Sequence, residues 1–162
     1  MRKVLLAAIA MFIFPLTSFS QVLNISVMDA NGNFKDSFKN DSVSISFIGT
    51  GHNLTIYVFN KLNERLYIEW ENFRWNGSGI AFGDDSRLSM GREKADEVVI
   101  GKESTHKTII RKENVKTYGV TPWISSSFAK NGGKQTLWVI VPIRYSSGII
   151  KDYKLCLRAN EY

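Results

Sequence analysis

The chain has few of the residues on which disulfide scaffolds, metal centres and most hydrolases depend. It contains one cysteine, Cys156, so no disulfide can form within the chain. Its two histidines, His52 in a glycine-rich turn and His106 in a polar loop, lack a metal-ligand spacing. No zinc motif, nucleophile elbow or phosphate-binding glycine loop is present. We therefore expect no metal, no cofactor and no catalytic site.

Two features come nearest to reactive chemistry. Glu69 and Glu71 would lie about 7 Å apart along a strand, a separation that also occurs between the carboxyl groups of glycosidases. Alternation places both opposite an inward-facing Trp70, so we interpret them as surface residues that keep a sheet soluble. Cys156 is interpreted as a small strand residue, and an intermolecular disulfide stays open if its thiol is exposed.

Charge of one sign is not concentrated in any segment. The net charge is +6 at pH 7, and the cations are interspersed with acids, as in the stretch 92–97. Such mixing is typical of a solvated surface and disfavours nucleic acid as a partner. Proline-rich linkers, internal repeats and helical periodicity are also absent, so we expect a single domain.

A long apolar run occurs only near the N-terminus. Arg2 and Lys3 precede about thirteen apolar residues, 4–16, which is the length of a signal-peptide core and too short to span a bilayer. This pattern predicts a signal peptide at 1–20, cleaved before Gln21, and a domain at 21–162. The protein is therefore expected in the periplasm or at the cell surface, without a membrane span.

The pattern that is present is alternation with period two, which runs through the stretch 54–82. Two segments in it, 54–59 and 65–71, alternate apolar with polar or aromatic side chains, as strands with one buried face require. We predict two consecutive β-hairpins here. The first would turn through the loop 60–64, and the second through Asn76-Gly77, a dipeptide suited to a type I′ turn.

A further hairpin is predicted near the C-terminus, with strands at 137–145 and 149–157 and a turn at 146–148. Trp138 and Ile140 are apolar on the face opposite the main apolar row, which suggests a central strand covered on both sides. Several short strands with turn signals between them predict an all-β fold. We expect an antiparallel, immunoglobulin-like β-sandwich of seven to nine strands.

Part of this pattern resembles a family. Asn60-Lys61 is followed after five residues by Tyr67-Ile68-Glu69-Trp70 and then by Asn76-Gly77, and the terminal strands 140–145 and 153–157 add to the likeness. The pattern is similar to that of small, uncharacterised exported β-sandwich proteins of Bacteroidota. The resemblance implies an exported protein with a β-sandwich fold, and it brings no activity with it.

Aromatic side chains are the strongest candidates for binding. Tyr57 and Tyr67 are expected on the face opposite the main apolar row, with Trp75 next along the chain. Carbohydrate-binding sandwiches stack sugar rings on such platforms, and peptide-binding ones use aromatic anchors. The alternative is that both faces of these strands are buried and that the rings fill the core.

The segment 117–134 is the longest irregular stretch and carries two large apolar residues, Trp123 and Phe128. Loops of this length are often functional, so we predict that it borders a partner site. The alternative is that Trp123 plugs the end of the domain. The sequence thus favours an exported, non-catalytic module that binds a protein or cell-envelope partner, with a carbohydrate-binding module as the alternative.

Overall fold

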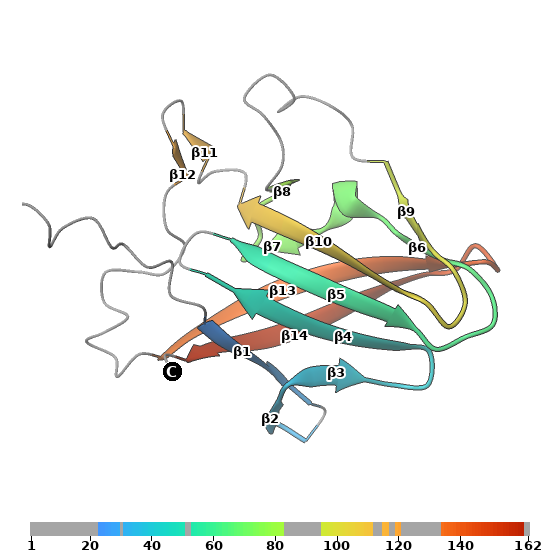
Figure 1. Ribbon diagram of the computed structural model, residues 1–162, viewed down its shortest axis with the longest axis horizontal. Helices are drawn as coiled ribbons and strands as arrows, with labels where there is room; N and C mark the ends of the chain where they lie inside the picture. Colours follow the sequence, from blue (N-terminus) through green and yellow to red (C-terminus); the bar gives the residue numbers. More distant parts are fainter. Residues whose placement is uncertain are drawn as a thin grey trace, which may run out of the picture.

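The computed structural model describes residues 23–29, 31–50, 53–82, 95–111, 115–116, 119–120 and 134–160. The predicted signal peptide and the expected cleavage site lie outside these residues. Within them nearly all regular structure is antiparallel strand, which confirms the all-β prediction (Figure 1). The strands are β1 (Leu23–Met28), β2 (Phe34–Lys35), β3 (Ser37–Lys39), β4 (Val43–Gly49), β5 (Leu54–Asn60), β6 (Leu66–Ile68), β7 (Arg74–Trp75), β8 (Ile80–Phe82), β9 (Glu97–Val99), β10 (Ser104–Arg111), β11 (Val115–Lys116), β12 (Gly119–Val120), β13 (Lys134–Tyr145) and β14 (Ile150–Asn160).

One curled sheet contains twelve of the described strands, and β11 and β12 form a separate pair. The order along the main path is β8-β10-β5-β4-β1-β14-β13-β6-β9. Strand β1 pairs with both β4 and β14, so it joins the half of the sheet that contains β5 to the half that contains β13. In Figure 1 the strands β4, β5 and β10 lie across β13 and β14. The immunoglobulin-like arrangement stays a prediction.

The core lies inside the curl and draws on both halves of the sheet. Strand β4 shows how alternation builds it, because Val43, Ile45 and Phe47 are buried and the residues between them are not. The largest fully buried side chains are Trp70, Trp75, Phe73, Ile45, Leu54, Ile56, Leu66, Ile68, Ile80, Ile109, Leu137 and Ile143. Strands β1, β4, β5, β13 and β14 thus each contribute one apolar row to a single core, and β10 contributes Ile109.

The C-terminal hairpin forms as the sequence predicts. Strands β13 and β14 pair from Lys134↔Asn160 to Arg144↔Ile150, and Gly148 adopts φ +84° in the turn. Pro142 lies inside β13, and its carbonyl accepts a hydrogen bond from the Glu69 N–H at 3.1 Å. Because N–H and C=O of one strand residue point the same way, the missing donor of Pro142 faces the gap between β6 and β7. The proline therefore interrupts no continuous ladder.

The prediction that β13 is covered on both faces is wrong at one position. Trp138 is 56% exposed, whereas Ile140 is half-buried. Cys156, directly opposite Trp138, is a buried strand residue, and burial raises the pKa of its thiol. A strand can be paired on both edges and still present one face to solvent, because edge pairing and face covering are independent.

The first of the two predicted hairpins in 54–82 does not form. Strand β5 pairs with β4 and β10, whereas β6 pairs with β13 and β9. The Asn60 side chain accepts a hydrogen bond from the Leu62 N–H at 2.9 Å, and the Lys61 N–H donates to the Ser42 carbonyl at 2.8 Å. These bonds turn the chain away from β5, so the loop 61–65 crosses to the other half of the sheet.

The strand that follows this loop is also shorter than predicted. It ends at Ile68, and a 3-10 helix η1 (Trp70–Asn72) replaces its continuation. Trp70 is buried as expected, but Glu69 is buried too. Its carboxylate accepts hydrogen bonds from Arg144 and Asn72 at 3.0 Å each. The interpretation of Glu69 as a solvent-facing residue is therefore wrong.

The turn at Asn76-Gly77 has the backbone that the sequence predicts, with φ +47° and +82°. The Trp75 and Ser78 backbones exchange hydrogen bonds of 2.8 and 3.0 Å across it. Its two arms then diverge, because β7 pairs with β13 and β8 pairs with β10. The turn thus connects the two halves of the sheet.

Candidate functional site

The outer surface of β4, β5 and β10 carries an ordered set of polar and aromatic side chains. Ser46, Tyr57 and His106 are directly opposite one another on the three strands. In the next row Ser44 lies opposite Phe59. The four residues of β4 and β5 alternate with buried neighbours, and His106 is paired with Tyr57, so all five share the outward side of the sheet. We call this surface the serine–aromatic face.

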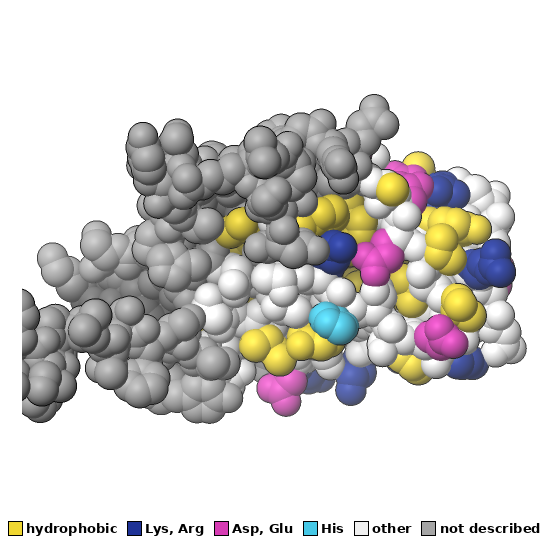
Figure 2. All heavy atoms as spheres, turned by 45° about the horizontal axis from the view of Figure 1, so that its top comes forward, with side chains coloured by type: hydrophobic (Ala, Val, Ile, Leu, Met, Phe, Trp, Pro, Cys, Tyr) yellow, Lys and Arg dark blue, Asp and Glu magenta, His cyan; other side chains and the backbone are white. Residues whose placement is uncertain are grey.

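The aromatic rings of this face are accessible. Tyr57 is 36% exposed and Phe59 is 39% exposed. The Tyr57 and His106 rings stack, with centroids 5.5 Å apart and planes at 23°. In Figure 2 the histidine side chain, coloured cyan, lies beside hydrophobic side chains coloured yellow. The Tyr57 and His106 rings thus form one stacked pair across two neighbouring strands, with Phe59 exposed two residues from Tyr57.

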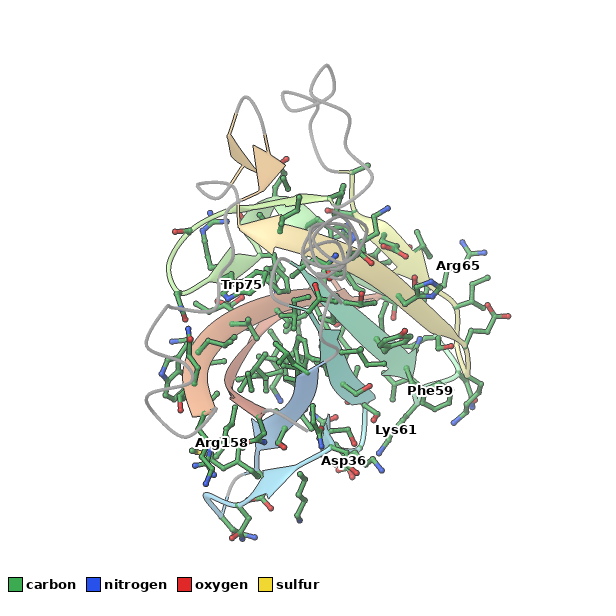
Figure 3. The ribbon with its side chains drawn as sticks, turned by 60° about the vertical axis from the view of Figure 1, so that its left-hand side comes forward. Asp36, Phe59, Lys61, Arg65, Trp75 and Arg158 are labelled. Carbon is green, nitrogen blue, oxygen red and sulfur yellow. The ribbon has the colours of Figure 1, made fainter. Side chains whose placement is uncertain are left out.

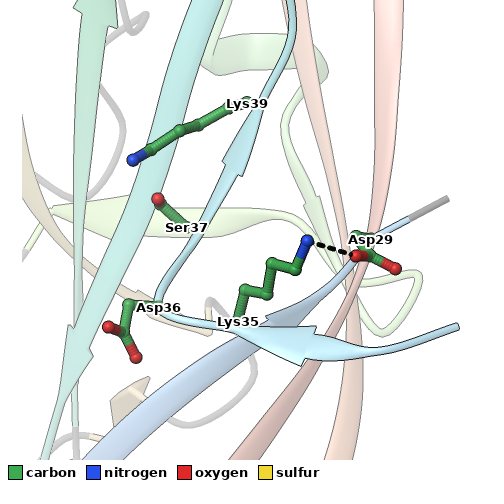
Figure 4. Close-up of a pocket in the computed structure, with 5 residues that line it drawn as sticks. All are labelled: Asp29, Lys35, Asp36, Ser37 and Lys39. Atoms are coloured by element: carbon green, nitrogen blue, oxygen red, sulfur yellow. Dashed lines mark ion pairs between the residues drawn. The ribbon is translucent and has the colours of Figure 1, made fainter. Parts of the chain in front are cut away.

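Hydroxyl groups and two shallow hollows adjoin these rings. One hollow of about 440 Å³ is lined in part by Ser37, Lys39, Ser44 and Ser46. A second, of about 430 Å³, shares Ser37 and Lys39 with the first (Figure 4). Both hollows are lined by β3, and the first is also lined by β4. The face therefore combines flat rings with donors and acceptors at its border.

An ion pair closes one side of the second hollow. The Lys35 Nζ lies 2.8 Å from Asp29 Oδ2, and Asp29 Oδ1 accepts the backbone N–H groups of Asn31 and Asn33 at 2.9 Å each. These bonds, above all that from Lys35, hold the pKa of Asp29 below its usual value. In Figure 4 Lys35 reaches toward Asp29, whereas Ser37 and Lys39 point to the other side. Lys39 is thus the cation directed toward the serines.

The aromatic residues singled out in the sequence do not form one site. Tyr57 lies on the serine–aromatic face. Tyr67 is half-buried beneath Arg144, whose guanidinium carbon is 4.4 Å from the ring centroid. Trp75 is fully buried, so its indole belongs to the core and cannot form part of a surface. Trp123 and Phe128 lie outside the described residues.

Arg144 belongs to a charged cluster that holds strands together. Its Nε lies 3.0 Å from Glu69 Oε1, and its guanidinium also pairs with Asp96. Hydrogen bonds to Asp96 and Glu69 raise the pKa of Arg144 above its usual range. Because Glu69 is engaged by Arg144 and Asn72, it is poorly placed to act as a general acid or base.

His106 is a binding candidate that the sequence pattern did not indicate, because the pattern predicted a polar loop at this position. It lies in β10, which starts at Ser104, and not in a polar loop. The signal for this strand is weak because Ser104, Lys107 and Thr108 are polar on both faces. Thr108 nevertheless pairs with Thr55, with 2.9 Å between their hydroxyl oxygens. Two threonines with high strand propensity, Thr105 and Thr108, could have indicated the longer strand.

No group of three or more histidine, cysteine or acidic side chains in the described parts of the chain could hold a metal ion. No helix among the described residues is long and apolar enough to cross a membrane. No protein-family model, curated protein or solved structure matches this chain. Proposals about its function therefore depend on the geometry of its own surfaces.

Proposed function

We propose that the protein is an exported, non-catalytic binding module and that the serine–aromatic face is its binding surface. The observation that carries this proposal is the exposure of Tyr57 and Phe59 on one side of β5, beside the stacked His106. Large rings left in water are unfavourable in an isolated fold, and they contribute most when a ligand covers them. Export is supported by the apolar run 4–16 behind Arg2 and Lys3.

The ligand class that fits this surface best is a carbohydrate chain. Sugar rings present flat C–H faces that stack on aromatic rings, and their hydroxyls pair with groups such as Ser44, Ser46 and Ser37. The serines lie within one or two strands of Tyr57, so stacking and hydrogen bonding can occur together. A protein partner is the alternative, since exposed rings also serve as anchors in protein interfaces.

Binding to the neutral glycans of an array and to gels containing neutral polysaccharides tests this proposal. Tyr57→Ala and Phe59→Ala should each weaken the strongest interaction about tenfold, equivalent to about 1.4 kcal/mol of lost stacking. Trp138→Ala is the matched control, because it removes an exposed aromatic from another part of the sheet. Binding to a neutral glycan that survives both substitutions on β5 would contradict the site.

The protein alternative has its own readout. A photo-crosslinking phenylalanine analogue at position 59 would trap a protein partner in the native cell envelope, and the same analogue at position 138 is the control. A crosslink specific to position 59 without glycan binding would replace the carbohydrate with a protein ligand. If neither a crosslink at position 59 nor glycan binding is observed, the proposed binding surface is refuted.

Export is tested separately. The protein recovered from the expected compartment should begin at Gln21, and the intact mass of the secreted product shows this directly. A product that retains Met1 would contradict export through a cleaved signal peptide. This result would leave the serine–aromatic face as a binding surface unaffected.

A further inference from the structure

A second exposed surface lies on the outer side of β13, β14 and β7, and Trp138 is at its centre. Trp138 is the most exposed of the aromatic side chains whose surroundings the structure describes, at 56%. Its backbone is held in place by Asn76, whose N–H donates to the Trp138 carbonyl at 2.8 Å. The Trp138 N–H in turn donates to Asn76 Oδ1 at 2.7 Å. The indole is thus presented from a fixed strand position.

Three cationic residues surround Trp138 on the same side of the sheet. Ile140 lies opposite Lys154 on one neighbouring strand and opposite Arg74 on the other, and Thr136 lies opposite Arg158. Residues two apart along a strand share a face, so each of these cations is diagonal to Trp138. Diagonal neighbours in an antiparallel sheet are about 7–8 Å apart. We call Trp138, Lys154, Arg158 and Arg74 the Trp138 face.

The cations of the Trp138 face have no carboxylate partner among the described residues. The described ion pairs involve Lys35 and Arg144. Arg158 instead lies over the Phe34 ring, with its guanidinium carbon 3.7 Å from the centroid. Arg74 donates to the backbone carbonyls of Glu71 and Phe73 at 2.7 and 2.8 Å. These contacts orient the two guanidinium groups, and neither contact is with a carboxylate.

The nearest acidic residue on the same side of β14 does not change this balance. Asp152 lies opposite Pro142, one diagonal step beyond Ile140 and two residues from Lys154. Among the described residues that are diagonal to Trp138 or one step beyond, three cations and one carboxylate therefore share this side of the sheet. This excess of positive charge would attract an anion to the face.

We propose that the Trp138 face binds an acidic polysaccharide, with a sugar ring on the Trp138 indole and the carboxylates of the chain at Lys154, Arg158 and Arg74. Along β14, Lys154 and Arg158 are separated by about 14 Å at 3.4 Å per residue. This row of charges along one strand suits an extended polyanion better than a single small anion. In Figure 3 Arg158 and Phe59 lie on opposite sides of the molecule, so this site is distinct from the serine–aromatic face.

Affinity electrophoresis of the purified protein in gels containing polygalacturonate tests the proposal, with dextran as the neutral polymer. We expect retardation by polygalacturonate only. Trp138→Ala should weaken it about tenfold through lost stacking. Lys154→Glu should weaken it at least as much, because it replaces attraction with repulsion. Ile100→Ala is the control, because it removes an exposed apolar side chain that belongs to neither face, and it should leave the retardation unchanged.

Measurements at varied salt concentration and with lipid vesicles distinguish a specific polysaccharide site from nonspecific attraction between charges. Raising the NaCl concentration from about 0.01 M to about 1 M shortens the Debye length from about 30 Å to about 3 Å, so binding should weaken but stay dependent on Trp138. Retardation that is insensitive to Trp138→Ala would overturn the proposal, as would equal binding to dextran. Binding to phosphatidylglycerol vesicles without binding to polygalacturonate would also overturn it. Because both side chains are exposed, unchanged thermal melts of the two variants confirm that their folds are intact.

Discussion

Two polar clusters hold strand β9 to the rest of the sheet, and they differ in charge and in burial. The first is centred on Asn60, a neutral amide with 0% exposure. Its Nδ2 donates to the Val99 carbonyl at 3.0 Å and to the Glu64 carbonyl at 2.7 Å, and its Oδ1 accepts the Leu62 N–H at 2.9 Å. Each polar atom of this amide thus has a backbone partner.

The second cluster is charged and lies at the border of the solvent. Arg144, whose side chain is 31% exposed, pairs with Glu69 and Asp96. The neighbouring Glu97 of β9 accepts the Trp70 Nε1–H at 2.9 Å and a hydrogen bond from Thr105. Several carboxylates and one guanidinium therefore connect β9 to β6, β10 and β13.

The comparison shows that formal charge is a poor guide to how much a polar contact stabilises. A buried group that loses its partner bears the full cost of desolvation, about 1–3 kcal/mol for each unpaired donor or acceptor. An ion pair in partial contact with water is screened and contributes about 0–1 kcal/mol. We therefore expect the neutral Asn60 to matter more than the charged Glu69.

The largest effect is expected for Asn60→Ala. It removes the partners of the Val99 and Glu64 carbonyls and of the Leu62 N–H, and it should lower the free energy of unfolding by about 3–5 kcal/mol. Asn63→Ala, in the same loop but exposed, is the control and should change it by less than about 0.5 kcal/mol. Denaturant melts measure both. If Asn60→Ala lowers the free energy of unfolding no more than Asn63→Ala does, the buried amide is not the stronger of the two clusters.

A smaller loss is expected for Gly101→Ala, in the turn that follows β9. A Cβ at Gly101 would lie 2.5 Å from the Asn63 carbonyl carbon, so the backbone of one of the two loops must move. This overpacking should cost about 1–3 kcal/mol. Lys102→Gly is the contrast, because Lys102 has φ +64°, which glycine adopts without penalty. A Gly101→Ala melt equal to that of wild type would show that the close packing of Gly101 against the Asn63 backbone does not constrain β9.

Glu69→Ala should cost about 1 kcal/mol at low salt, because Arg144 keeps its contact with Asp96. The effect should shrink in about 1 M NaCl, where the Debye length is about 3 Å, whereas the effect of Asn60→Ala should not. Glu103→Ala, an exposed glutamate in the turn after β9, is the control. A Glu69 effect that is independent of salt would indicate that burial, and not charge, dominates at this position as well.

The smallest effect concerns the most exposed ion pair, Asp29 and Lys35. Because the folded state lowers the pKa of Asp29, the pair stabilises the protein above the pKa of an unfolded aspartate, about 3.9. This stability is lost as the pH falls through the lower pKa of the folded state. Acid melts of wild type and Asp29→Asn should therefore converge at the lowest pH. Curves that stay parallel down to the lowest pH would contradict a lowered pKa.

Features that depend on neighbouring residues alone could be predicted from the sequence. Alternation identified the buried rows of β4, β5 and β13, because side chains on a strand alternate between two faces whatever strand lies beside it. The turns at Asn76-Gly77 and 146–148 could also be predicted, since positive φ angles favour glycine and asparagine locally. Tyr57 on an outward side followed from the same alternation.

Features that depend on distant parts of the chain could not be predicted. The sequence does not show that Glu69 would meet Arg144, which is 75 residues away. It does not show that Trp138 would be exposed, or that His106 would stack on Tyr57. Each outcome depends on which strand lies next to which, and on what covers the outer face.

The sequence by itself determined that this protein is all-β and which side chains of its clearest strands share a face. Only the tertiary structure decided that β5 pairs with β4 and β10 instead of β6, and that Ser46, Tyr57 and His106 become neighbours. The physical reason is that period-two alternation is a property of one strand. The choice of partner depends on hydrogen bonds and packing between segments far apart in the chain, such as those of Asn60 with Val99.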